Sequence, residues 1–185
     1  MTKQPPSAKP GAILNSNLLR DIREFQAHFD QLYLAVISRL LDDQGSFVAT
    51  LTMLVGVDTL AGVLAPDDGT GERFRAFVSK YFPDPLKSHS HALWECRTRM
   101  VHSLHPGPFA LVCGQPKLHL MRYGTDMEGR AVLHVNIQDL FAAWIAASQA
   151  FFSELGKDEN LQANFRKRVA AADGGAPETL IGFGR

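Results

Sequence analysis

Hydrophobic side chains recur every three or four residues along the first long segment of the chain, residues 18–41. This spacing places them on one face of an α-helix, and they are Leu18, Ile22, Phe25, Phe29, Leu32, Val36 and Leu40. Residues 46–64 are apolar around nearly the whole helical circumference, which is typical of a helix at the centre of a bundle. The pattern therefore predicts two helices, joined by the polar turn of residues 42–45.

Shorter elements follow in the middle of the chain. Helices are predicted over 72–81 and 90–104, and the first ends before Pro83 and Pro85 because proline disfavours helix at the preceding residue. The aromatic residues of 72–81 keep helical spacing, so its basic residues, Arg73 among them, are expected on a solvated face. Turn-forming residues then separate three short β-prone runs, which predict a small antiparallel meander of residues 109–113, 117–123 and 131–135.

A last long helix is predicted to begin after Asn136, whose side chain suits the N-cap, with Asp139 as the acidic residue three positions later. A further helical stretch follows it. Together these elements predict a mainly α-helical bundle with the small meander inserted before the last long helix. We expect one domain over residues 13–172, between a disordered leader of residues 1–12 and a flexible tail of residues 173–185.

Composition narrows the classes of protein that fit. A chain of 185 residues is long enough to bury one sizeable core. Its 19 basic and 19 acidic side chains cancel, which argues against a broadly basic nucleic-acid surface but leaves room for a small local site. No uninterrupted apolar run reaches the roughly 18–20 residues of a membrane span, and the proline-containing start lacks the apolar core of a signal peptide. We therefore expect a cytoplasmic protein that binds no membrane.

The segment 90–104 has an unusual distribution of polar residues. At about 100° per residue, one stripe of the predicted helix and its end collects His91, Glu95, Thr98, His102 and His105. Arg97 falls instead within the apolar face, close to Val101. A charge at that position must either reach the polar stripe or be buried against a partner. Asp58, inside the apolar helix 46–64, is a candidate partner.

An arginine, four intervening residues and a histidine, here Arg97 and His102, resemble the R-x4-6-H motif of the HEPN superfamily. Arg99 and His105 also match it, with five intervening residues. The resemblance implies a helical bundle, often dimeric, and in many members a metal-independent ribonuclease activity. The residues around Arg97, followed by a proline and strands, resemble a bacterial HEPN-like group of unassigned function. Ribonuclease members often have Asn, Asp or His directly after the arginine, where this chain has Thr98.

Such a pair suits RNA cleavage without a metal or a cofactor, because the 2′-OH of RNA is an internal nucleophile. Histidine titrates near neutral pH, so His102 could take the 2′-OH proton or donate one to the leaving oxygen. Arg97 could hold the phosphate bidentately and offset developing charge. One helix supplies few groups, so we expect a homodimer to complete the site. The candidate substrate-binding residues are Thr98, Arg99, His105 and Lys87.

Two other interpretations stay open. Arg97 could be a structural arginine bonded to carbonyl groups or to an acid such as Asp58, with His102 near the helix C-terminus, where the dipole favours positive charge. The chain would then be a non-catalytic dimeric interaction or ligand-binding module, with a protein partner such as an antitoxin. The histidine-rich pattern also suggests zinc, but structural zinc sites usually include cysteine and catalytic sites a carboxylate. We therefore assign no metal site.

Overall fold

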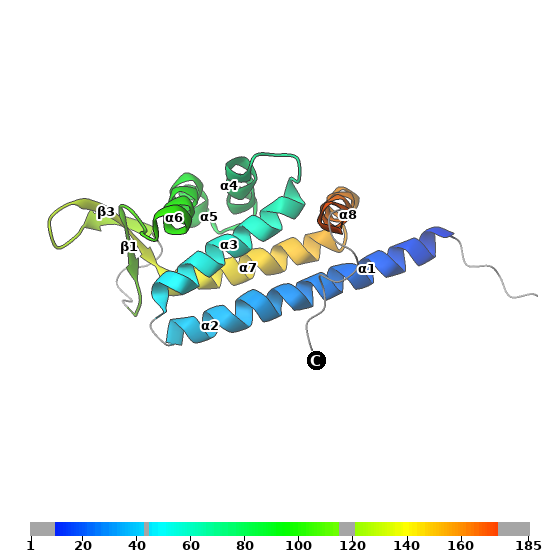
Figure 1. Ribbon diagram of the computed structural model, residues 1–185, viewed down its shortest axis with the longest axis horizontal. Coiled ribbons are helices and arrows are strands. Elements are labelled where there is room, and N and C mark those ends of the chain that lie inside the picture. The colour runs from blue at the N-terminus through cyan, green and yellow to red at the C-terminus, as the bar shows by residue number, and fades with distance from the viewer. Residues whose placement is uncertain (1–9, 43–44, 115–120, 174–185) are drawn as a thin grey trace, which may run out of the picture.

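The computed structural model describes residues 10–42, 45–114 and 121–173. A long helix runs along one edge of the molecule, and α3 returns beside it towards α4 (Figure 1). The helices up to the sheet are α1 (Pro10–Phe29), a π-helical turn η1 (Asp30–Leu34), α2 (Ala35–Asp42), α3 (Ser46–Leu64), α4 (Thr70–Tyr81), α5 (Asp84–Lys87) and α6 (Ser90–Ser103). Because α1 begins at Pro10, the last three residues of the expected leader are helical. The rest of that leader and the tail beyond residue 173 lie outside the described residues.

A three-stranded sheet lies at one end of the bundle (Figure 1). Its strands are β1 (Phe109–Val112), β2 (Met121–Thr125) and β3 (Ala131–Asn136). The strand order is β1-β3-β2, with β2 antiparallel and β1 parallel to β3. The predicted antiparallel meander is therefore wrong for β1. Burial explains the order: β3 buries most of its residues, whereas β2 is largely exposed and forms an edge. Residues 117–120 of the predicted second strand lie outside the described residues.

The last long helix, α7 (Ile137–Leu155), begins where the sequence predicts. The Asn136 side chain accepts hydrogen bonds from the backbone N–H groups of Gln138 and Asp139, which confirms its role as N-cap. Within the core, the Trp144 ring of α7 stacks on Phe29 of α1, with centroids 5.3 Å apart. Helix α8 (Glu159–Asp173) then packs against α3 and α7. The mainly α-helical class is confirmed.

Helix α3 is the central helix, as its all-round apolar pattern predicts. Ten of its residues are buried, and it packs against α2, α4, α6, α7 and α8. By length and composition alone this helix could cross a membrane, contrary to the expectation that no segment could. In the structure, however, 56% of its most apolar window is buried inside the bundle. A buried core helix of a soluble protein has the same composition, so this feature is weak evidence for a membrane.

Candidate functional site

Helix α6 presents its apolar residues to the bundle and ends earlier than predicted. Leu93, Cys96 and Met100, at helical spacing, are its buried residues. The helix stops at Ser103 because Leu104 takes a left-handed backbone conformation, with φ of 50°. The expectation that His105 continues the helical stripe is therefore wrong. Its Nδ1 atom instead accepts a hydrogen bond from the backbone N–H of Gly107, over 2.9 Å.

Arg97 lies between α6 and α3 and is mostly buried. Its side chain is 18% exposed, and Nη2 lies 2.6 Å from Oδ2 of Asp58, which is 11% exposed. The guanidinium carbon is also 5.2 Å from the centroid of the Trp94 ring, about one turn earlier in α6. The structure thus places Arg97 among apolar neighbours and gives it Asp58 as a partner, as the sequence indicated.

The ion pair is compensated in charge but incompletely in hydrogen bonding. Arg97 Nη2 contacts Asp58 Oδ2 closely, whereas Asp58 Oδ1 and Arg97 Nε lack a hydrogen-bond partner among the described residues. Burial raises the pKa of the Asp58 carboxyl, and the charges of Arg97 and, to a smaller degree, Arg73 oppose that rise. The arrangement is therefore costly for the fold, since buried charges with unmet hydrogen bonds lose solvation.

His102 lies in the last turn of α6 and is exposed. It follows Arg97 by five positions, which corresponds to roughly 140° around the helix. No hydrogen bond joins these two side chains in the part of the chain that the structure describes. The motif residues therefore face different surroundings, Arg97 towards α3 and His102 towards solvent.

The remaining predicted residues divide between helix-internal contacts and the C-terminal corner of α6, which we define as Arg99, His102, His105 and Gly107. The Thr98 hydroxyl donates to the Trp94 carbonyl, and Lys87 pairs with Asp84 on α5, away from this corner. Arg99 pairs with Glu95 and lies against Gly107, where a Cβ would be 2.3 Å from Arg99 Cδ. The corner therefore gathers three of the predicted basic side chains on the surface.

Sequence reasoning missed Arg73 of α4. Its side chain is not on a freely solvated face: the residue is partly buried, and Nε is buried without a hydrogen-bond partner among the described residues. Arg73 precedes the buried Phe74 and lies one turn before the buried Phe77, so it borders the buried side of α4. Its place next to Phe74 is the feature of the sequence that indicates partial burial of Arg73.

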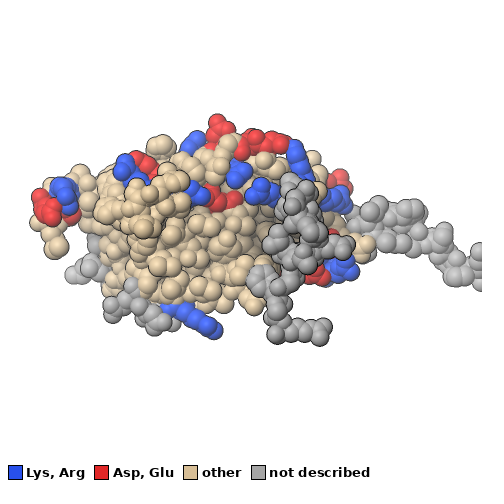
Figure 2. Space-filling view, in the orientation of Figure 1, with Lys and Arg blue, Asp and Glu red and all other residues tan. Residues whose placement is uncertain are grey.

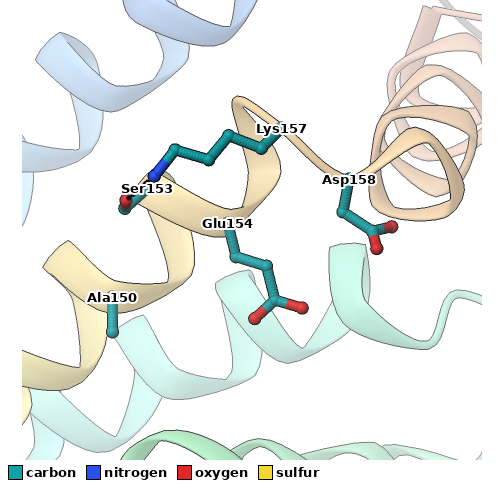
Figure 3. A pocket seen from close by; sticks show the side chains of 5 residues that line it. All are labelled: Ala150, Ser153, Glu154, Lys157 and Asp158. Carbon is teal, nitrogen blue, oxygen red and sulfur yellow. Dashed lines mark hydrogen bonds between the residues drawn. The ribbon is translucent and has the colours of Figure 1, made fainter.

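A separate shallow hollow lies near the C-terminal end of α7 and has a volume of about 530 Å³ (Figure 3). Glu154, which lines it, accepts hydrogen bonds from Lys80 and from the Tyr81 hydroxyl, whose pKa is raised to about 12, mainly by burial. Asp158 accepts from the backbone N–H of Leu161 in the first turn of α8. These polar groups serve contacts within the fold, and we assign no site there.

In the described part of the chain, no three His, Cys, Asp or Glu side chains come together in a group that could hold a metal ion. Comparison with family models, with curated proteins and with solved structures finds no match to the chain. Arg97, His102 and their neighbours are therefore the residues whose chemistry bears on function.

Proposed function

We propose that the chain is a HEPN-like domain that binds and cleaves RNA without a metal, through Arg97 and His102. One observation carries the proposal: α6 combines an arginine held in position by Asp58 with a histidine that is open to solvent. An arginine whose guanidinium is fixed in advance loses less entropy when it binds a phosphate. An exposed imidazole is free to exchange protons with substrate and water.

The proposed reaction uses the substrate's own nucleophile. The 2′-oxygen attacks the adjacent phosphorus while His102 accepts the 2′-OH proton. The P–O5′ bond breaks, His102 gives the proton it has taken up to the leaving 5′-oxygen, and a 2′,3′-cyclic phosphate is left. Arg97 offsets the charge that builds on the non-bridging oxygens in the transition state.

The opposed directions of Arg97 and His102 favour a site built from two copies. Within one chain the two side chains leave α6 on different sides, so we infer that the His102 that serves a phosphate on Arg97 belongs to a second copy. A two-fold axis would then form two such sites. Dimerisation also fits two exposed apolar residues at the C-terminal end of α6: Val101 is 38% exposed, and Leu104, the residue after the helix, is 76% exposed.

The surface beside α6 is compatible with a second copy. Figure 2 shows a broad region almost without Lys, Arg, Asp or Glu over α2 and the first half of α3. Val48 of α3, at 50% exposed, and Val36 of α2, at 42%, lie on these elements. A face without charges can meet its own copy without like-charge repulsion, and exposed apolar patches commonly mark such contacts.

Incubating the purified protein with a mixed pool of structured and unstructured RNA, in EDTA, tests the proposal. We expect cleavage, with 2′,3′-cyclic phosphate at the new ends, because neither the nucleophile nor the proton transfers need a metal. Analysing the ends separates this reaction from contaminating metal-dependent nucleases, which leave other termini and stop in EDTA.

The Arg97–Asp58 pair favours one alternative, a non-catalytic dimeric interaction module in which the pair joins α6 to α3. A folded wild-type protein that cleaves no RNA across broad pH and salt would select that alternative. A protein partner such as an antitoxin and a cytoplasmic location stay predictions in either case.

A further inference from the structure

Asp58 faces two arginines from different helices. Arg97 of α6 pairs with it directly, and Arg73 of α4 lies close enough for its charge to stabilise the ionised carboxylate. Arg73 has no ion pair of its own with an acid among the described residues. One carboxylate between two guanidinium groups leaves one net positive charge in a partly buried position. An isolated excess charge of this kind is unfavourable unless an anion or water compensates it.

Hydrogen-bond donors without a partner also favour a bound anion or water near Asp58. The Nε atoms of Arg73 and Arg97 are both buried and donate to no partner in the described structure. A buried donor without a partner is unfavourable, so these two donors call for an explanation.

Helices α4 and α6, which carry Arg73 and Arg97, pack closely around Trp94. A Cβ added at Gly71, in the first turn of α4, would lie 3.0 Å from Cε2 of Trp94, so α4 and α6 approach closely here. Trp94 and Arg97 both belong to α6, and the Arg97 guanidinium carbon lies 5.2 Å from the Trp94 ring centroid. Arg97 of α6 therefore contacts Asp58 directly, and Arg73 of α4 acts on it through its charge, from two helices that pack closely at Trp94.

We propose that Arg73 and Arg97 together bind one phosphodiester group of an RNA chain, with Asp58 as the residue that positions Arg97. This inference rests on the proposed function and adds Arg73 to its substrate contacts. Charge selects the class of ligand, because a phosphodiester carries one negative charge and neutralises the excess positive charge of the cluster. Its two non-bridging oxygens also suit two guanidinium groups, which donate in pairs.

A short oligonucleotide without 2′-OH groups tests this contact apart from cleavage. Binding of a labelled 2′-deoxy tetranucleotide, followed by fluorescence anisotropy, requires no proton transfer and no His102. We expect Arg73→Gln to weaken binding by about 10-fold or more, since a hydrogen bond to a charged group contributes about 1.5–3 kcal/mol. The slope of log K against log salt should also decrease by about 1. Arg166→Gln, an exposed arginine of α8, is the matched control.

Two further arms make the result specific. Arg73→Lys keeps the charge but not the paired donors, so it should recover only part of the affinity. AMP, whose phosphate is a dianion, should lose at least as much affinity in Arg73→Gln, because its larger charge interacts more strongly with each arginine. Equal losses in Arg73→Gln and Arg166→Gln, with both proteins folded by circular dichroism, would overturn the proposal. Arg73-dependent binding without RNA cleavage would support this phosphate contact and contradict the proposed ribonuclease reaction. RNA cleavage that does not depend on Arg73 would support the reaction and contradict the Arg73 contact.

Discussion

Replacing His102 with alanine is expected to lower the rate of RNA cleavage by about 10²–10⁴-fold, the usual contribution of a general acid–base residue. The fold should tolerate this change because the side chain is exposed in the last turn of α6. Cleavage rates in EDTA, measured together with thermal unfolding, check both statements.

His91 and His105 supply the controls for that experiment. His91 is an exposed histidine in the first turn of the same helix, so His91→Ala should leave the rate unchanged. His105 lies beyond the helix end and accepts a hydrogen bond from Gly107, so His105→Ala tests the second motif register, with Arg99. A large loss in His105→Ala and none in His102→Ala would contradict the assignment of His102.

Replacing Arg97 with methionine should destabilise the fold at neutral pH, by about 3 kcal/mol, because it leaves the Asp58 carboxylate buried without its ion-pair partner. The effect should depend on pH in a definite direction. Burial already raises the pKa of Asp58 in the folded protein above its ordinary value, and loss of Arg97 removes the largest opposing influence. The ionised form is then disfavoured in the folded state. Stability is therefore lost as the pH rises through the folded-state pKa and regained as the pH falls towards 3.8, the ordinary value.

Urea unfolding at pH 7 and near pH 4.5 measures this dependence, and the destabilisation should shrink to about 1 kcal/mol at the lower pH. The double variant Asp58→Asn and Arg97→Met should be more stable at pH 7 than Arg97→Met alone, since no buried charge is left. Arg99→Met, which removes an exposed pair with Glu95, should change stability little. The same loss for Arg97→Met at both pH values would show that Asp58 does not carry the effect.

Local pattern predicted the longer helices, from amphipathic spacing or, for α3, from an apolar composition all round the helix, whereas the four-residue α5 was not predicted. The range of α3 and the capping of α7 by Asn136 follow from residues adjacent in the chain. Arg97 was informative for the same reason: its helical phase put a charge in an apolar face, and Asp58 was a charge in the apolar helix that packs against it. Contacts between distant segments can be predicted when both ends break a local pattern.

The features that sequence did not predict depend on tertiary structure. The order of the strands follows from the burial of β3 between its two neighbours, which alternation within each strand does not encode. The position of His105 depends on the backbone conformation of Leu104, a residue type that rarely adopts positive φ. The aromatic spacing of α4 predicts a solvated Arg73, although the residue borders the buried side of the helix; in the structure it is partly buried and its charge acts on Asp58.

Mixing two inactive variants tests the two-copy RNA site most directly. Arg97→Met and His102→Ala, unfolded and refolded together, form mixed dimers in which one site pairs the intact Arg97 of one copy with the intact His102 of the other. We predict that each variant alone cleaves no RNA in EDTA, whereas the mixture recovers cleavage with cyclic phosphate ends. An inactive mixture, with mixed dimers demonstrated by mass spectrometry and an active wild-type protein refolded in parallel, would contradict it.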